Sequence, residues 1–474
     1  MFCRFLCWMK LNVFILALLG TFGCSFSGHT EKQPNIIFLL TDDQRWDAMG
    51  AMGNKIIQTP NMDDLANNGV LFTNAHVTTS ICCSSRASIL SGQYVSRHGI
   101  EGFRTPFSPA ALQQTYPMLL KNNGYSIGFI GKYGVGNPQD FPDSLYHYWG
   151  CDALHQPNYE NEDGEGNFIH YTDIVSSRIN EFLERFGKDE KPFCLSVSFK
   201  APHCQDGDPR QFIYAERYKK LYANVEFALP ETAGSSYYSF FPQDFRIPVF
   251  NGVERQNEAR KRWEIRFPDK EKFQESVRSY YRLISGVDDA IGILRKKLEE
   301  IGKAENTIIV FMGDNGFYLG EHGLAGKWYA HRESVKVPFF VFDPRADESQ
   351  RGKRVDEFAL NIDVAPTILS LAGVEIPETM QGINALDLLS HKTPEREMFF
   401  YEHNLDIPTI PNSEAVISKK YKYIKYADLS TPFEEFYDLE NDSLEKVNLV
   451  GEEKYADAVQ EFRKYLEVMG NEVK

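Results

Sequence analysis

Residues 35–41 form an almost uninterrupted apolar run, Asn-Ile-Ile-Phe-Leu-Leu-Thr, which is followed by two aspartates. A run of this kind predicts a strand that is buried on both faces, as in a parallel sheet. The same pattern recurs at residues 70–72, 125–130, 193–199, 307–312 and 337–342. Helical patterns lie between these runs, notably at residues 62–69 and 273–300. The alternation predicts an α/β fold, with a mostly parallel sheet flanked by helices on both faces.

The pattern changes after about residue 375. Short strand patterns occur at residues 398–401, 415–417 and 422–424. A helical pattern at residues 452–468 follows them. We therefore predict a main domain at residues 35–375 and a smaller C-terminal α+β subdomain at residues 376–474. Within the main domain, residues 205–270 are rich in glycine, proline, tyrosine and charge without periodicity, and we predict a long insertion or lid there.

The N-terminus has the layout of a secretory signal peptide. Arg4 and Lys10 are the only charges in the first 28 residues, and residues 11–19 form a short apolar run followed by small residues. This run is too short to span a bilayer. We predict a signal peptide at residues 1–23, a polar tether at residues 24–34, and an exported protein of the periplasm or cell envelope.

Cys24 stands directly after Gly23. Residues 19–24 resemble a bacterial lipoprotein processing site, although Thr21 occupies the position where leucine is usual. We expect a lipid on Cys24 that attaches the protein to a membrane; the alternative is ordinary cleavage nearby, with Cys24 as a bystander. No other stretch reaches the roughly 18 apolar residues of a membrane-spanning helix.

The charge balance excludes one broad class of partner. The chain has 51 basic and 66 acidic side chains, which give a net charge of −15. General nucleic-acid binding needs a basic surface, so we expect no nucleic-acid partner. A local basic pocket for a small anion remains compatible with an acidic surface. Eight cysteines in 474 residues are too few for a disulfide scaffold.

Two of the predicted buried strands end in oxygen-bearing pairs. Asp42 and Asp43 follow the first strand, and Asp314 and Asn315 follow the strand at residues 307–312. Ligands of open α/β sheets bind outside the carboxyl ends of the strands. Four such side chains suit a hard divalent cation, Ca²⁺ or Mg²⁺. The alternative is that these residues only form turns or cap helices.

Residues 82–93 read Cys-Cys-Ser-Ser-Arg-Ala-Ser-Ile-Leu-Ser-Gly-Gln. Ser84 and Ser85 are good caps, so we expect a helix to start here with an N-terminus that favours anions. Arg86 would add a guanidinium group that matches tetrahedral oxyanions. Cys82 would lie at the mouth of this anion site. The alternatives are a buried free thiol or a structural disulfide.

This segment resembles the signature of the type I sulfatases, which belong to the alkaline phosphatase superfamily. That signature is Cys-x-Pro/Ala/Ser-x-Arg, followed by x-x-x-Leu-Thr/Ser-Gly, and Ser84 occupies the position where proline or alanine is more common. Further blocks resemble those of the family along most of the chain. They are residues 34–44, 131–134, 201–203, 313–327 and 436–442.

The resemblance implies an alkaline-phosphatase-like fold and a set of site residues. Asp42, Asp43, Asp314 and Asn315 match the ligands of one Ca²⁺ ion. Cys82 matches the cysteine that a maturase oxidises to formylglycine, which also contacts the metal and supplies the nucleophile. The matched catalytic groups are Arg86, Lys132 and Lys327, which hold the formylglycine and the sulfate, and His203, which protonates the leaving alcohol.

One position departs from the family pattern. Family members usually carry a histidine two residues after the lysine that matches Lys132, and this chain has Gly134 there. His98 and His322 are candidates to replace that imidazole, and the sequence does not rank them. The alternative role for His322 is to pack against its own loop.

The resemblance implies an exported sulfatase that removes sulfate esters, with sulfated carbohydrates as the expected substrate. One alternative is a phosphate or phosphonate ester hydrolase of the same superfamily, because both anions are tetrahedral. Another is a non-catalytic binding lipoprotein on this scaffold, which only Gly134 favours. The sequence leaves open the sugar, the sulfate position, exo or endo action and the oligomeric state.

Overall fold

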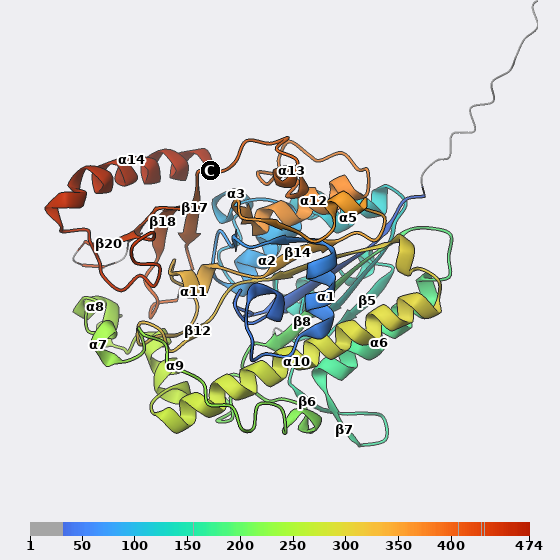
Figure 1. Cartoon of the computed structure of the whole chain (residues 1–474), viewed down its shortest axis with the longest axis horizontal. Coiled ribbons are helices and arrows are strands. Elements are labelled where there is room, and N and C mark those ends of the chain that lie inside the picture. The colour runs from blue at the N-terminus through green and yellow to red at the C-terminus, as the bar shows by residue number, and fades with distance from the viewer. Residues whose placement is uncertain (1–31, 155, 406, 428, 431) are drawn as a thin grey trace, which may run out of the picture. The chain divides into compact units, whose positions relative to one another are not determined.

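An eight-stranded sheet lies at the centre of residues 33–474 (Figure 1). The computed structural model describes residues 32–474 apart from 155, 406, 428 and 431. The predicted signal peptide, Cys24 and most of the tether lie outside the described residues. In sheet order the strands are β15 (Lys353–Val355), β2 (Val70–Phe72), β14 (Phe339–Phe342), β11 (Thr307–Gly313), β1 (Asn35–Asp42), β8 (Phe193–Pro202), β4 (Ser126–Gly131) and β5 (Tyr148–Cys151).

Strand β1 lies between β11 and β8 and runs parallel to both. All eight of its residues are buried, as the apolar run predicts. Strand β14 is antiparallel to its neighbours β11 and β2, whereas the other pairs in the sheet are parallel. The predicted mixed, mostly parallel sheet is therefore confirmed. The carboxyl ends of β1, β11, β8 and β4 lie at one edge.

The side chains of β1 alternate between two apolar cores. Ile37 and Leu39 belong to the core under α1 (Pro60–Asn68), α6 (Tyr171–Phe186) and α10 (Lys270–Glu300). Phe38 and Leu40 belong to the core under α2 (Cys82–Ser91), α5 (Tyr116–Asn122) and α12 (Val364–Leu371). Helices therefore cover both faces, as predicted. None of the helices formed by the described residues is long and apolar enough to cross a membrane.

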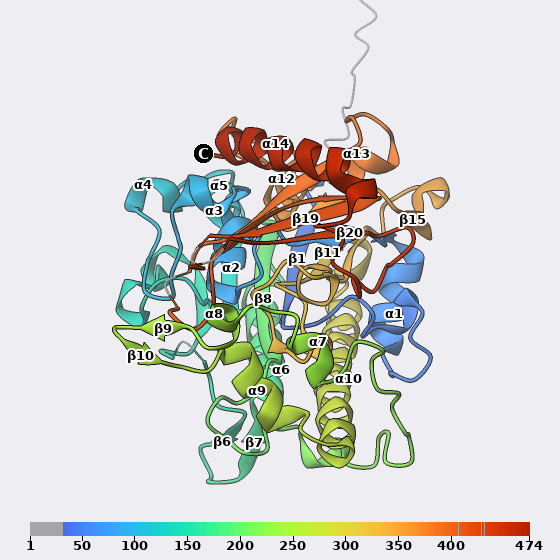
Figure 2. The ribbon, with the colours of Figure 1, turned by 90° about the vertical axis from the view of Figure 1, so that its left-hand side faces the viewer.

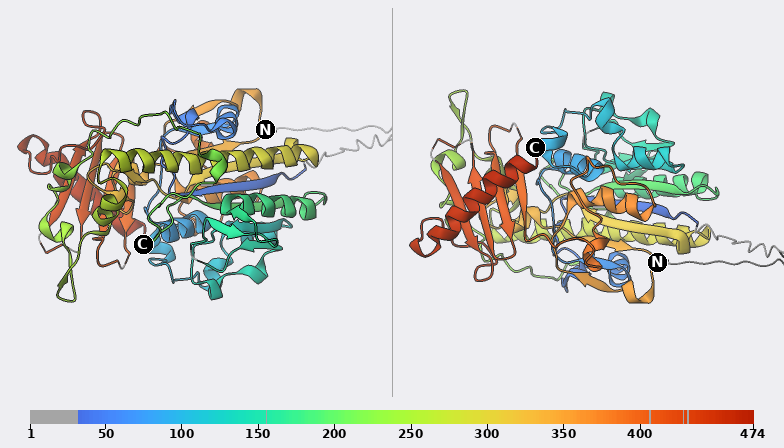
Figure 3. Two further views of the ribbon diagram at one scale, coloured as in Figure 1. Left: turned by 90° about the horizontal axis from the view of Figure 1, so that it is seen from below. Right: turned by 90° about the horizontal axis from the view of Figure 1, so that it is seen from above.

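A second, antiparallel sheet of four strands forms the C-terminal part (Figure 3). Its strands are β17 (Met398–His403), β18 (Ser413–Ser418), β19 (Tyr421–Tyr426) and β20 (Phe433–Asp438). Helix α14 (Ala456–Glu472) packs on it and begins four residues later than predicted, after a 3₁₀ turn at Glu453–Tyr455. The C-terminal α+β subdomain is thus confirmed. Its predicted boundary at residue 375 stays a prediction, because Gln33–Lys474 forms one compact unit.

The segment predicted as an insertion is built from short elements (Figure 2). They are α7 (Ser235–Tyr238), α8 (Gln243–Arg246), the hairpin of β9 (Val249–Phe250) and β10 (Val253–Glu254), and α9 (Glu258–Arg266). Asn257 caps α9 by accepting hydrogen bonds from the backbone of Ala259 and Arg260. The role of a lid stays a prediction.

His403, at the end of β17, makes the stability of this fold depend on pH. Its ring is completely buried, and neither ring nitrogen has a hydrogen-bond partner among the described residues. Burial lowers its pKa to about 3, from an ordinary value of 6.5. Between pH 6.5 and about pH 3, His403 is protonated in the unfolded chain but neutral in the folded protein. The free energy of unfolding therefore falls as the pH falls through this range.

We expect His403→Phe to remove about 1.4 kcal/mol per pH unit from the pH dependence of the unfolding free energy below pH 6.5. Urea unfolding at pH 7.5, 6.0 and 5.0 measures this dependence for both proteins. Parallel curves for the wild type and the variant would show that folding does not lower the pKa of His403.

Candidate active site

The carboxyl ends of β1 and β11 bring four oxygen-bearing side chains together. Asp42, Asp43, Asp314 and Asn315 are each at most 1% exposed. The Asp43 backbone N–H donates to Asp314 Oδ1 at 3.0 Å, and Asn315 Nδ2 donates to Asp43 Oδ1 at 2.7 Å. The two pairs, which are about 270 residues apart in the sequence, form one cluster.

These residues fit a hard divalent cation. Asp42 Oδ1 and Asn315 Oδ1 are buried and accept no hydrogen bond from any described residue. One ligand atom each from Asp42, Asp43 and His203 lies within 4.8 Å of the others. Unpaired carboxylate and amide oxygens are costly to bury, and they are the ligands that Ca²⁺ and Mg²⁺ prefer.

Arg86 and Lys132 contact the carboxylates of the same cluster. Arg86, on α2, places Nη2 2.9 Å from Asp314 Oδ2 and 3.5 Å from Asp42 Oδ2. Lys132, which follows β4, places Nζ 2.5 Å from Asp42 Oδ2. Burial alone raises the pKa of a carboxyl, but the charges of Lys132 and its neighbours hold the pKa of Asp42 well below its ordinary value.

Lys327 completes the ring of cations. It follows β13 (Ala325–Gly326), and its Nζ contacts Asp43 Oδ1 and lies 3.8 Å from Asp42 Oδ1. Burial, together with the charge of Asp42, raises the pKa of Asp314 to about 7. The buried carboxylates therefore repel one another despite three nearby cations, and further positive charge would stabilise them.

Cys82 is the first residue of α2 and is 2% exposed. Ile81, in an extended conformation, occupies the N-cap position. The prediction that Ser84 and Ser85 cap this helix is wrong, because both lie inside its first turn. Ser85 instead donates a hydrogen bond to the carbonyl of Asp314 at 2.5 Å, which ties α2 to the end of β11.

The thiols of Cys82 and Cys83 are both free, so neither forms a structural disulfide. Burial raises the pKa of both, and that of Cys83 reaches about 12. The charges nearest to Cys82 are those of the site, with Lys132 and Lys327 acting on it most strongly. Cys83 instead belongs to the apolar core under α2. Of these two thiols, that of Cys82 faces the polar cluster and that of Cys83 does not.

His203 directly follows β8 and lies beside Asp43 at the border of the cluster. Its Nε2 lies 3.6 Å from Asp43 Oδ2, and its Nδ1 lies 2.6 Å from the carbonyl oxygen of Cys204. That short contact places a proton on Nδ1, so Nε2 is the nitrogen that faces the site. Burial lowers the pKa of His203 to about 4.

Three further polar residues beside His203 are absent from the sequence predictions. Gln156 Nε2 lies 3.2 Å from His203 Nε2. Asp206 Oδ1 accepts a hydrogen bond at 3.0 Å from Arg262 of α9. Gln156 and Arg262 come from segments without a motif, so no sequence signal could have placed them here.

The family follows from a sequence comparison. The sequence model described as Sulfatase matches residues 34–374. This chain belongs to the sulfatase family. A second model, described as the C-terminal region of N-sulphoglucosamine sulphohydrolase, matches residues 320–472. The resemblance found in the sequence is thus confirmed, and the protein is a sulfuric ester hydrolase.

Similar proteins support this membership. The N-acetylglucosamine-6-O-sulfatase of Bacteroides thetaiotaomicron is 30% identical over 95% of this chain and 89% of its own length. A solved structure in complex with its substrate, D-glucosamine-2-N,6-O-disulfate, is 29% identical, with a TM-score of 0.76 over 93% of this chain and 98% of that one. The structure of the phosphonate monoester hydrolase of Agrobacterium radiobacter has a TM-score of 0.75 over 93% of this chain and 96% of its own. Its sequence is 21% identical, so this likeness shows a shared fold alone.

Neither histidine proposed to replace the imidazole missing at Gly134 hydrogen-bonds to the site within the described part of the sulfatase. His98 lies 3.0 Å from Ser88 Oγ through Nε2, and accepts from the Ile100 N–H through Nδ1. His322 stacks on His331 at a centroid distance of 4.6 Å. Both rings are therefore part of the packing of their own segments.

The backbone explains why glycine stands at position 134. Gly134 has φ +77°, a conformation that favours glycine, and a β-carbon there would lie 2.9 Å from Arg86 Cδ. A histidine at this position would displace the guanidinium that holds Asp314. The loop and Arg86 are thus arranged around a residue without a side chain.

We expect Gly134→Ala to lower the unfolding free energy by about 1–3 kcal/mol and to reduce turnover, because it strains the loop and pushes Arg86. Gly124→Ala is the matched control, since Gly124 has φ +90° but no atom within 4 Å of a β-carbon. Denaturant unfolding and sulfate release compare the two variants. If both variants lose the same stability and activity, contact with Arg86 is not the cause.

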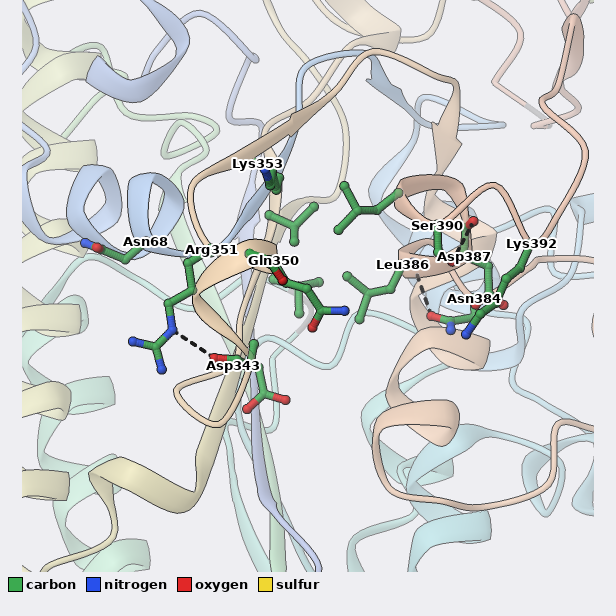
Figure 4. A pocket seen from close by; sticks show the side chains of 16 residues that line it. Asn68, Asp343, Gln350, Arg351, Lys353, Asn384, Leu386, Asp387, Ser390 and Lys392 are labelled. Atoms are coloured by element: carbon green, nitrogen blue, oxygen red, sulfur yellow. Dashed lines mark hydrogen bonds between the residues drawn. The ribbon is translucent and has the colours of Figure 1, made fainter.

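A cavity of about 510 Å³ lies at the opposite edge of the sheet (Figure 4). Asp343, directly after antiparallel strand β14, and Lys353, on β15, line it with Asp387 and Lys392. Since β14 runs against β11, its carboxyl end points away from the cluster of Asp42 and Cys82. This cavity is separate from the candidate active site.

Proposed function

We propose that this sulfatase hydrolyses sulfate esters of carbohydrates outside the cytoplasm, using a formylglycine made from Cys82 and one Ca²⁺ ion. The observation that carries the proposal is the meeting of Cys82, at the start of α2, with three buried cations and four oxygen ligands. The names of the relatives that act on sulfated glucosamines support the carbohydrate substrate. The charge and apolar pattern of residues 1–23 supports export.

The metal would be held by Asp42, Asp43, Asp314 and Asn315, next to the residue at position 82. When present, the ion would neutralise negative charge on the sulfate, and the formylglycine hydrate would supply the nucleophilic hydroxyl. The chain's own cations act with them. Lys132 and Lys327 approach from two separate loops, so they can bind different oxygens of one tetrahedral anion.

Arg86 acts mainly as a positioning residue. Its Nε donates to Asp314 Oδ2 at 2.9 Å, and its Nη1 donates to the carbonyl of Lys132 at 2.6 Å. One guanidinium thereby fixes both a metal ligand and the loop that carries Lys132. Its position four residues after Cys82 places both on the same face of α2, one turn apart.

His203 supplies the proton for the leaving alcohol. Its Nδ1–H is held by the carbonyl of Cys204, so a second proton must bind at Nε2, which faces the site. A developing alkoxide is far more basic than an imidazole, so the proton passes from Nε2 to the leaving oxygen. Asp43 Oδ2, 3.6 Å from Nε2, favours the protonated ring during this transfer.

The proposal is tested by measuring sulfate release from a panel of sulfated sugars, including 6-O-sulfated N-acetylglucosamine, by purified protein made with a maturase. Mass spectrometry of the peptide that contains residue 82 is run in parallel. We expect sulfate release only from protein that carries the aldehyde. Faster hydrolysis of a phenylphosphonate monoester would favour the phosphonate hydrolase alternative, which the shared fold keeps open. Protein with the aldehyde but no hydrolysis would indicate a binding role.

A further inference from the structure

Partly exposed polar side chains lie next to His203, whereas the centre of the candidate active site is buried. Cys82, Asp42 and Asp314 are at most 2% exposed. By contrast, the side chain of Asp206 is 47% exposed and that of Arg262 is 21% exposed. Asp206 also lies close to the histidine, since ligand atoms of His203, Cys204 and Asp206 are within 4.8 Å of one another. Partly exposed polar groups therefore lie directly next to His203, the proposed proton donor.

Arg262 is fixed from three directions. Its Nη1 donates to Asp206 Oδ1 at 3.0 Å, and its Nε donates to Glu258 Oε1 at 2.9 Å. Its guanidinium carbon lies 5.1 Å from the centre of the Trp328 ring, and Trp328 directly follows Lys327. The side chain therefore spans from the loop of His203 to the loop of Lys327.

The pair leaves one acceptor and one donor available side by side. Asp206 Oδ2 and Arg262 Nη2 make no hydrogen bond to any described residue. Arg266, on the same helix, already ties α9 to this loop, because it donates to Gln211 Oε1 at 2.8 Å and contacts Cys204 Sγ at 2.9 Å. A partly exposed ion pair adds little stability of its own, so structure alone does not account for Asp206 and Arg262.

Gln156 offers another free group at the same place. Its Nε2 lies 3.2 Å from His203 Nε2. Its Oε1 is buried and has no hydrogen-bond partner among the described residues. A buried amide oxygen without a partner is costly unless a ligand or water satisfies it.

We infer that Asp206, Arg262 and Gln156 form the subsite for the sugar of the leaving alcohol, an inference that rests on the proposed function. His203 protonates the leaving oxygen, so groups on its exposed side face the sugar, whereas Lys132 and Lys327 face the sulfate. An adjacent carboxylate and guanidinium present an acceptor beside a donor, which matches two vicinal hydroxyls of a pyranose. The insertion at residues 205–270 thus determines substrate choice.

The test compares two sulfate esters that differ in hydroxyl groups. For the wild type, Asp206→Asn and Arg262→Lys, kcat and KM are measured with 4-nitrophenyl sulfate and with the sulfated monosaccharide that the wild type hydrolyses best. We expect kcat/KM for the sugar to fall about 10- to 100-fold in each variant, mainly through KM. With the aryl ester, which lacks sugar hydroxyls, we expect a decrease of less than about threefold.

Asp208→Asn is the matched control. The Asp208 carboxylate pairs with Arg210 at 2.7 Å in the same loop, and no hydrogen bond or ion pair joins it to His203 or Arg262 within the described residues, so we expect the ratio of the two activities of this variant to equal that of the wild type. Thermal unfolding of each variant separates misfolding from loss of binding. Equal losses on both esters, or no loss on the sugar, would overturn the subsite. A wild type that carries formylglycine and hydrolyses neither ester would overturn the proposed function and, with it, the subsite.

Discussion

Cys82→Ala is expected to abolish sulfate release, with kcat/KM falling at least about 10⁴-fold. The substitution removes the side chain that would become the nucleophile, and no other described thiol faces the cations of the site. Binding of the sulfate by Lys132 and Lys327 would remain, so the loss should appear in kcat more than in KM. Sulfate release with the best sugar substrate measures both.

Cys83→Ala is the matched control, because Cys83 is adjacent in sequence but packs into the apolar core. We expect it to keep activity within a few-fold of the wild type and to lose some stability from a small cavity. The register predicts the same outcome, since Arg86 lies four residues after Cys82 and three after Cys83. Full activity in Cys82→Ala, or a loss confined to Cys83→Ala, would contradict the assignment of the nucleophile.

The central sheet could be predicted because its strands are buried on both faces. Strands β1, β8 and β11 read as apolar runs, and their acidic ends identify the edge where a ligand binds. Strand β20, Phe-Glu-Glu-Phe-Tyr-Asp, carries charged residues, so no continuous apolar run marked it. An uninterrupted apolar run, rather than strand length, decided which strands the sequence indicated, since the three-residue β2 was predicted and the six-residue β20 was not.

The start of α2 shows a limit of local rules. Serines are good caps in general, yet Ser85 lies within the helix because its hydroxyl has a tertiary partner, the carbonyl of Asp314. Gln156 and Arg262 show another limit, since each reaches the site through contacts between distant segments. By contrast, Asp42 and Asp314 could be paired in advance, because parallel neighbouring strands bring their carboxyl ends together.

Removal of the proposed metal ion is the second change for which we expect a large effect. Treatment with a Ca²⁺ chelator is expected to lower sulfate release at least about 100-fold, because the buried carboxylates then repel one another and the sulfate loses its main counter-charge. Added Ca²⁺ should restore activity. It should also raise the thermal midpoint, since an ion at 100 times its Kd stabilises the folded state by about 2.7 kcal/mol.

Asn315→Ala tests the ligand set without changing its charge. Asn315 Oδ1 is buried and accepts no hydrogen bond from the described residues, so the proposed ion would supply the partner that this oxygen lacks. We expect the variant to need at least about tenfold more Ca²⁺ for half-maximal activity and for half of the rise in thermal midpoint. Asn384→Ala, in the cavity at the opposite edge of the sheet, is the control and should keep the wild-type Ca²⁺ dependence. A chelated wild type with unchanged activity and midpoint would show that these four side chains do not hold an ion that the reaction uses.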